Sequence, residues 1–208
     1  EKEILEAKIS SKSEKKAFIN GMLTGSGYLF NRQGKRGIII EVPSLELARK
    51  AENLIYNITN HSPIIYESKT KNNLNDKTIY IVEILNENAI KLLMFSGQFN
   101  NQINTFESIN IKNFNSDKSK KAFLQGLFAT SGYIYIPQNM NKRSGGYSLE
   151  IIVKNAEIAK EIKTLLNHFN ITARSRAKNN TVIIYIKDAE IILDFLIVIG
   201  AVNTYFEL

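Results

Sequence analysis

Hydrophobic positions along the chain follow two spacings, and the order of these spacings is the same in both halves. Apolar residues three and four apart predict helices, and alternation between apolar and polar residues predicts strands. We therefore expect the order αββαββα twice, with the strands in antiparallel hairpins, as in an α+β fold rather than a doubly wound parallel one. The predicted helices are 13–26, 45–58 and 87–96, and then 117–131, 156–169 and 189–199. The predicted strands are 28–31, 37–42, 64–71 and 78–85, and then 133–137, 147–153, 171–178 and 182–187.

The two halves are also related residue by residue. Residues 15–30 read KKAFINGMLTGSGYLF and residues 120–135 read KKAFLQGLFATSGYIY, with 8 of 16 positions identical. Similarity continues downstream, where 68–73 matches 175–180. An internal repeat of this kind indicates two copies of one structural unit. We divide the chain into an N-terminal extension at 1–12, a first repeat at 13–97, a polar linker at 98–115 and a second repeat at 116–208.

Small residues recur four apart on one face of the first helix of each half. Glycine inside a helix costs about 1 kcal/mol relative to alanine, but small residues allow two helix backbones to approach closely. The alternative, two unrelated amphipathic helices with stray glycines, is disfavoured by the repeat. The predicted seam between the helices consists of Gly21, Gly25, Gly126 and Thr130, with Phe18, Met22, Phe123 and Leu127 in the core below.

Both ends of these helices carry capping residues. Ser13, and Ser116 or Asp117, are the predicted N-caps, because their side-chain oxygens accept hydrogen bonds from free backbone N–H groups. Gly27 and Gly132 follow the helices, where we expect left-handed C-terminal caps.

The two seam segments carry a family resemblance. Residues 19–27, INGMLTGSG, and 124–132, LQGLFATSG, resemble the nine-letter signature of LAGLIDADG homing endonucleases. This resemblance implies a pseudo-twofold protein whose two signature helices pack at the centre, while two antiparallel sheets form a saddle over DNA. The chain is also similar to the N-terminal domain of WhiA-type bacterial regulators, most closely in the second half. That similarity implies roles in transcription, cell division and, in spore formers, sporulation. It also implies a C-terminal helix-turn-helix domain beyond Leu208.

The resemblance implies a metal site that the residues do not supply. A LAGLIDADG nuclease has an acidic side chain near the end of each signature helix, and the two carboxylates bind Mg²⁺, which stabilises the attacking and leaving oxygens. The matching residues here, Ser26 and Ser131, are neutral. Glu14 and Asp117 are about three turns away, roughly 14–18 Å along the helix, and do not reach. We therefore predict no enzyme activity, no bound metal and no cofactor.

A serine nucleophile is a different possibility, and it would need a base within hydrogen-bond reach. His61 and His168 are the two histidines, and each lies at the end of the second helix of its half. We favour the simpler interpretation that they are cationic residues at helix C-termini, where the helix dipole stabilises positive charge.

Charge and composition permit a polyanionic partner. The net charge is +7 and the pI is about 9.4. Residues 1–115 contribute +3 (15 basic, 12 acidic) and residues 116–208 contribute +4 (12 basic, 8 acidic), so the charge is not confined to a tail. No apolar run is long enough to span a membrane, and the absence of Cys fits a reducing cytoplasm.

Basic residues are expected on the concave sheet faces and hairpin tips, which meet DNA in LAGLIDADG proteins. Arg174, Arg176 and Lys178 alternate along one predicted strand and therefore share a face. Lys69 and Lys71 are expected at the places of Arg176 and Lys178 in the first half. The opposing interpretation is solvated lysines, with acids such as Glu41, Glu67, Glu83 and Glu150 diluting the field. The predicted DNA-binding residues are Arg32, Lys35, Arg36, Lys69, Lys71, Lys142, Arg143, Arg174, Arg176 and Lys178.

The preferred hypothesis is a catalytically silent LAGLIDADG-like domain of a WhiA-like regulator. It would contact the phosphates of double-stranded DNA in the nucleoid. Tight specific binding by this domain alone is not expected, because no set of base-reading residues is evident. Two alternatives stay open. One is an interaction module for a protein partner or a ligand, with DNA binding left to the helix-turn-helix domain, and the other is a divergent metal-dependent homing endonuclease.

Overall fold

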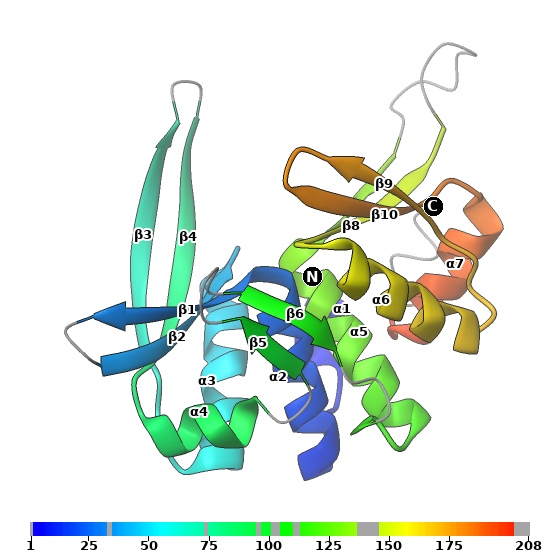
Figure 1. The fold of residues 1–208 in the computed structure, drawn as a ribbon. Helices are drawn as coiled ribbons and strands as arrows, with labels where there is room; N and C mark the ends of the chain where they lie inside the picture. Colours follow the sequence, from blue (N-terminus) through cyan, green and yellow to red (C-terminus); the bar gives the residue numbers. More distant parts are fainter. Residues whose placement is uncertain are drawn as a thin grey trace.

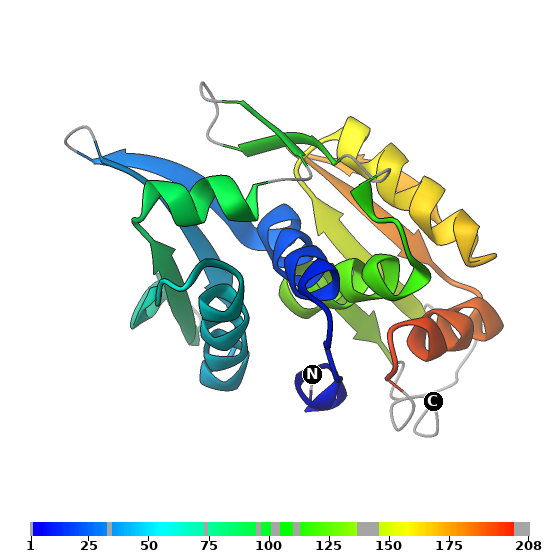
Figure 2. The same ribbon diagram turned by 90° about the horizontal axis from the view of Figure 1, so that it is seen from below.

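A central pair of helices, α2 (Lys12–Ser26) and α5 (Asp117–Ser131), lies between two four-stranded sheets (Figure 1). The computed structural model describes residues 2–32, 35–72, 75–94, 97–100, 105–109, 113–136 and 146–201. Further helices cover one face of each sheet, as the view from below shows (Figure 2). The predicted α+β class, the two repeats and the antiparallel hairpins are confirmed.

The two repeats contain the same elements in the same order. The sheet of the first repeat has the strand order β1-β2-β4-β3, and that of the second has the matching order β7-β8-β10-β9. The first repeat continues from α2 with β1 (Gly27–Arg32), β2 (Lys35–Val42), α3 (Leu45–Thr59), β3 (Ile64–Asn72), β4 (Asn75–Ile84) and α4 (Glu87–Leu93). The second continues from α5 with β7 (Gly132–Tyr135), β8 (Ser148–Val153), α6 (Ala156–His168), β9 (Arg174–Lys178), β10 (Thr181–Ile186) and α7 (Ala189–Val198).

Each sheet buries one face against helices, and the strand periodicity explains which one. In a strand, successive side chains point to opposite faces, and every second residue of β2 and β8 belongs to the main core. The face that packs on the helices is called the helix-covered face below, and the opposite one the open face. The core residues of these two strands are Ile38, Ile40 and Val42, and Leu149, Ile151 and Val153.

The close approach of α2 and α5 follows from two glycines. A Cβ at Gly21 would overlap the carbonyl oxygen of Phe123, and one at Gly126 would overlap that of Phe18. Further along, a Cβ at Gly25 would overlap the hydroxyl of Thr130. The predicted seam is therefore confirmed. The four residues predicted in the core below it, Phe18, Met22, Phe123 and Leu127, are fully buried.

The predicted capping residues are confirmed in part. Ser116 is the N-cap of α5, but α2 begins earlier than expected and its N-cap is Ser11, not Ser13. Glu14 explains the difference, because its backbone N–H donates to the Ser11 hydroxyl while its carboxylate accepts from the N–H of Ser10. The Ser13 hydroxyl instead bonds that of Ser119 across the seam, at 2.9 Å.

The prediction of left-handed caps at the ends of α2 and α5 is wrong. Gly27 and Gly132 have extended backbones, with φ of −81° and −98°, because each is the first residue of a strand. Glycine is required there for space. A Cβ at Gly27 would overlap the backbone of Leu23, and one at Gly132 would overlap the ring of Phe128.

A pair of equivalent amides ties each central helix to the last helix of its own repeat. The Asn20 side chain donates to the carbonyl of Leu93 at the end of α4, at 2.8 Å. Gln125, which occupies the same place in α5, donates to the carbonyl of Ile199 just after α7, at 2.9 Å. These bonds satisfy carbonyls that have no partner within their own helices.

The segment predicted as an N-terminal extension forms a short helix, α1 (Lys2–Glu6), that is fastened to the first repeat. Ile4 is buried, and the Lys50 ammonium of α3 donates to the carbonyls of Ile4, Leu5 and Ala7. Burial lowers the pKa of Lys50.

The segment predicted as a linker contains a small antiparallel hairpin, β5 (Gly97–Asn100) and β6 (Thr105–Ile109). Its end is attached to the second repeat, where the backbone N–H of Ile109 donates to the Glu161 carboxylate of α6. Burial raises the pKa of that carboxyl, although the hydrogen bond from Ile109 opposes the shift.

Candidate nucleic-acid interface

The open face of the second sheet carries the three cations predicted on β9. Ala173, just before the strand, belongs to the main core, so the alternating residues Arg174, Arg176 and Lys178 lie on the open face. All three are exposed. Because β9 is an edge strand, these side chains lie along the outer margin of the sheet. The sequence-based prediction that the three share one face is confirmed.

Arg176 is held in place by a group of side chains from the three neighbouring strands. Its guanidinium donates to the Glu150 carboxylate of β8 at 3.1 Å and lies over the ring of Tyr185. Tyr133 of β7 donates its hydroxyl to the same carboxylate. That hydrogen bond, together with burial, raises the pKa of Tyr133. Glu150 therefore orients Arg176 and also cancels part of its charge. Sequence reasoning treated Glu150 only as a diluting acid.

The first repeat does not present the equivalent cations. The strand registers of the two sheets, matched at the equivalent residues Gly27 and Gly132, show which positions correspond. By this match the counterpart of Arg176 is Tyr66, not Lys69. Lys69 is an odd number of residues from Tyr66, so it points to the helix-covered side of its sheet, where it pairs with Glu67 at 3.7 Å. The predicted equivalence of Lys69 with Arg176, and of Lys71 with Lys178, is therefore wrong. The error arose because residues 68–73 were matched with 175–180 by sequence alone, without knowledge of the strand register.

The other predicted DNA-binding residues divide into two groups. Arg36 is exposed, but it alternates with Gly37 and shares the helix-covered side with Ile38, beyond the end of the core. The remaining five fall outside the described residues or have side chains that are not described. They are Arg32, Lys35, Lys71, Lys142 and Arg143.

Apolar and aromatic residues occupy the edge strand on the open face of the first sheet, and Glu41 and Glu83 lie on its inner strands. Ile39 and Ile81 are buried there, although they do not belong to the main core. On the edge strand β3, Ile64 and Tyr66 are 52% and 38% exposed. These are the register positions of Arg174 and Arg176. The two open faces thus have different chemistry.

The hydroxyls at the ends of the seam helices are both committed to backbone carbonyls. Ser26 donates to the carbonyl of Glu41 at 2.6 Å, and Ser131 donates to that of Leu127 at 2.9 Å. Mg²⁺ in proteins is usually held by one or two carboxylates. Neither helix carries one at its end, and the Glu41 carboxylate of β2 lies near the Lys154 ammonium. Across the parts of the chain that the structure describes, no three His, Asp or Glu side chains gather closely enough to hold a metal ion. The residues at this place do not fit the divalent ion that the fold family implies.

A lysine that sequence reasoning missed lies at this same place. Lys154, in the turn after β8, donates to the carbonyl of Gly27, the residue that follows Ser26. Burial lowers the pKa of Lys154 to about 8, while the nearby Glu41 carboxylate opposes the shift. A signal was available in the sequence. The runs Val-Pro-Ser-Leu at 42–45 and Val-Lys-Asn-Ala at 153–156 both join a strand to a helix, and they differ by a cation.

The two histidines form hydrogen bonds with groups other than Ser26 and Ser131. His168 ends α6, as predicted, and its Nε2 lies 2.7 Å from the Asp117 carboxylate. That hydrogen bond lowers the pKa of Asp117. His61 lies two residues beyond α3, and its Nδ1 is 2.8 Å from the carbonyl of Thr59. The structure gives neither serine a histidine base.

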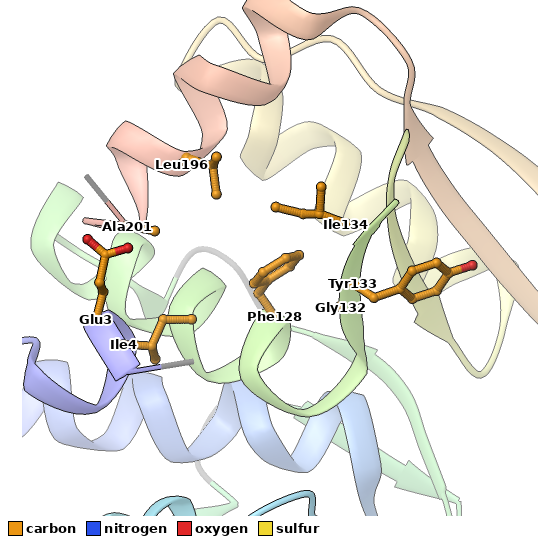
Figure 3. A pocket seen from close by; sticks show the side chains of 8 residues that line it. All are labelled: Glu3, Ile4, Phe128, Gly132, Tyr133, Ile134, Leu196 and Ala201. Carbon is orange, nitrogen blue, oxygen red and sulfur yellow. The ribbon is translucent and has the colours of Figure 1, made fainter. Parts of the chain in front are cut away.

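A cleft of about 240 Å³ lies under α1, on the second repeat (Figure 3). Phe128, Ile134 and Leu196 form its apolar wall, and the carboxylate of Glu3 lies at one side. Arg174, Arg176 and Lys178 do not line it, but Tyr133, which bonds Glu150, does.

Comparisons with known proteins agree with this arrangement. Residues 120–208 match the family model of the WhiA LAGLIDADG-like domain. A probable cell division protein WhiA from Clostridium botulinum is 33% identical over 144 residues, which are 67% of this chain and 44% of that protein. Full-length WhiA from Thermatoga maritima superposes with a TM-score of 0.68 and 21% identity, over 96% of this chain and 59% of that one. I-DmoI in complex with DNA and Mn superposes with a TM-score of 0.62 and 15% identity, over 91% and 97%.

The fold is therefore that of the LAGLIDADG homing endonucleases, with two open antiparallel sheets around a helix pair. Within that class the chain is similar to WhiA proteins, and its residues 120–208 match the WhiA LAGLIDADG-like domain. The chain spans 44% of the length of the Clostridium botulinum relative. Within the described residues, none of the helices combines the length and the apolar character that spanning a bilayer requires.

Proposed function

We propose that this chain is a DNA-associating scaffold of a WhiA-like regulator and that it takes part in the control of cell division. The names of its relatives supply the cell-division role, and the DNA complex of I-DmoI supports a nucleic-acid partner for this fold. The observation that carries the proposal is the row of exposed cations on the open face of β9.

The mechanism is electrostatic contact with DNA phosphates, which releases counterions and carries no base specificity. Glu150 already holds Arg176. Among the described side chains, no acidic group forms an ion pair with Arg174 or Lys178. These two residues are therefore expected to contribute most of the contact, and Arg176 to contribute less.

Charge reversal on β9 tests this proposal. Arg174→Glu with Lys178→Glu avoids placing a second carboxylate against Glu150, as Arg176→Glu would. The matched control is Lys160→Glu with Lys91→Glu, which reverses two exposed charges on the helices α6 and α4. Affinity for a labelled random-sequence duplex is measured by fluorescence anisotropy across a salt series. We expect the β9 variant to lose at least about tenfold and its salt slope to fall by about 2, with the control much less affected. Equal losses in both variants, or no binding by the unmodified chain at low salt, would contradict the proposal.

We further propose that the domain does not cleave DNA, because Ser26 and Ser131 stand where carboxylates are needed to hold the metal. Supercoiled plasmid with Mg²⁺ or Mn²⁺ should remain intact in the presence of the protein. Nicking that disappears with Ser26→Ala or Ser131→Ala would favour the divergent nuclease instead.

The cleft under α1 favours a second candidate, a small-molecule or peptide-binding module. Its apolar wall and single carboxylate suit an apolar ligand with a cationic group. Leu196→Trp would fill the cleft. If the cleft is functional, this change abolishes ligand binding detected by nuclear magnetic resonance screening while DNA affinity is unchanged. If no ligand in the screen shifts the resonances of the cleft, this candidate is rejected.

A further inference from the structure

Lys154 connects the two repeats at the base of the seam. It belongs to the second repeat, yet its ammonium donates to the carbonyl of Gly27 in the first, 127 residues away in sequence. Gly27 follows the last residue of α2, and the C-terminal end of a helix carries a partial negative charge that favours cations. The Ser26 hydroxyl is fixed beside it by the carbonyl of Glu41.

The pseudo-twofold relation shows that this cation is present once, not twice. Val42 and Val153 end equivalent strands, and Ser44 and Asn155 cap equivalent helices. Lys154 therefore corresponds to Pro43. A second asymmetry accompanies the first, since Glu41 in the first repeat corresponds to an isoleucine in the second. One repeat thus supplies a carboxylate and the other an ammonium.

Both charges lie close to one helix end, and burial partly removes the Lys154 ammonium from water. Lys154 is half-buried, and Glu41 is the charged group that acts on it. Glu41 also accepts a long hydrogen bond from the Tyr28 hydroxyl, at 3.4 Å. Where charges are desolvated, a second cation placed near an ammonium is strongly repelled.

We infer that the Lys154 ammonium is a resident cation at the place where the fold family holds a divalent ion, and that it excludes such an ion from the base of the seam. The inference deepens the proposed loss of nuclease activity, since it adds a second barrier to the missing carboxylates. Restoring the carboxylates alone should then restore only weak metal binding, because Lys154 would pair with them. Removing Lys154 as well should open the site.

The test is Mn²⁺ binding by the full chain, measured by electron paramagnetic resonance and by calorimetry in the absence of DNA. Three variants are compared with the unmodified protein. They are Ser26→Asp/Ser131→Asp, the same pair with Lys154→Met, and the same pair with Lys154→Arg, which keeps the charge. We expect no Mn²⁺ binding by the unmodified protein, weak binding by the pair, and binding at least about tenfold tighter when Lys154→Met is added. The variant with Lys154→Arg should bind as weakly as the pair.

Equal Mn²⁺ affinity with and without Lys154→Met would overturn the inference, as would Mn²⁺ bound at the seam of the unmodified protein. Circular dichroism checks that each variant is folded. If the pair of aspartates prevents folding, Ser26→Asp alone, with and without Lys154→Met, gives the same comparison. DNA binding is not part of the readout, so a failure of this inference is distinguishable from a failure of the proposed DNA association.

Discussion

The edge strands β3 and β9 occupy the same place in the two sheets, but their open faces differ in chemistry. The open face of β9 carries Arg174, Arg176 and Lys178, whereas β3 has an isoleucine, a tyrosine and a serine at the same register. The strand order and the packing on the helices are nevertheless the same. The two repeats therefore agree where side chains pack on the helices and differ on the open face. A contact with DNA phosphates would involve mainly the second repeat.

The difference extends inward from the edge. Glu150, which holds Arg176, faces Tyr133 across β7 and β8, while the equivalent pair in the first repeat is Ile39 and Tyr28. The first sheet thus lacks both the arginine and the carboxylate that orients it. Replacing a charged pair by apolar residues of similar size is often neutral for stability, so the fold does not require the Arg176–Glu150 pair at this place in the first sheet, whose open face carries Glu41 and Glu83 instead.

Equivalent substitutions in the seam should destabilise the protein alike in the two repeats. The loss of stability there should be the largest of the expected effects. Gly21→Ala and Gly126→Ala each add a methyl group that overlaps a backbone carbonyl of the partner helix. Alanine gains about 1 kcal/mol in helix propensity, but the overlap can only be relieved by separating the helices. We expect each change to lower the free energy of unfolding by about 2–4 kcal/mol, measured by urea denaturation.

Gly146→Ala is the control for the seam variants, because nothing lies within 4 Å of a Cβ at that position. It should change stability by less than about 0.5 kcal/mol. A large effect in only one of the two seam variants would show that the helices are not packed symmetrically.

Lys154 can lose a proton, whereas the equivalent residue Pro43 has no titratable side chain. We therefore expect Lys154 to make the stability of the protein depend on pH. The folded pKa of Lys154 is about 8, below its ordinary 10.5, so between these values the unfolded chain binds the proton and the folded chain does not. Stability should therefore rise with pH across that window, and below pH 8 this residue should have no effect on the slope. Lys50 also has a lowered pKa, so the contribution of Lys154 is the difference from Lys154→Met.

The difference in unfolding free energy between the unmodified protein and Lys154→Met should change by about 2 kcal/mol from pH 8 to pH 10.5, after a discount for residual exposure. Urea denaturation at several pH values measures it. Parallel curves for the two proteins would mean that the ammonium is not desolvated in the folded state.

Removal of the equivalent amides of Asn20 and Gln125 should cost different amounts of stability, because the two side chains differ in burial. Asn20 is 3% exposed, and Gln125 is only half-buried. Truncation to alanine leaves a helix-end carbonyl without its partner, and the cost is larger where water cannot replace the amide. We expect losses of about 2 kcal/mol for Asn20→Ala and about 1 kcal/mol for Gln125→Ala. Asn57→Ala, which removes an exposed helical amide, is the control. Equal losses for Asn20→Ala and Asn57→Ala would contradict this account.

The sequence predicted the fold well because the fold depends on features that repeat. Periodicity located the helices and strands, and the glycines at positions 21 and 126 identified the seam, since close backbone approach leaves no other choice of residue. The serines at 26 and 131 were found in the same way, from their position in the signature segments.

The surface could not be predicted equally well, because register and crossing contacts are three-dimensional. A shift of one residue moves every side chain of a strand to the other face, and this is how Lys69 was placed wrongly. Lys154 reaches across 127 residues to its acceptor. Nothing in the local sequence around Gly27 indicates that contact, and only a comparison with Pro43 would have drawn attention to it.

The smallest expected effect would sharpen the comparison of the edge strands by making β3 resemble β9. Tyr66→Arg with Ser68→Lys places two cations at the register positions of Arg176 and Lys178. If DNA lies over both open faces, affinity at low salt should rise about three- to tenfold, and the salt slope should increase by up to about 2.

Glu67→Arg is the matched control, because it adds the same two units of charge to the same strand on the helix-covered side. An equal gain from both variants would show that DNA responds to net charge and not to a particular face. No gain from Tyr66→Arg with Ser68→Lys, in a protein that still binds through β9, would restrict the contact to the second repeat. In that case the apolar face of β3 would be the surface to search for a different partner, since exposed apolar patches on a soluble domain often mark such contacts.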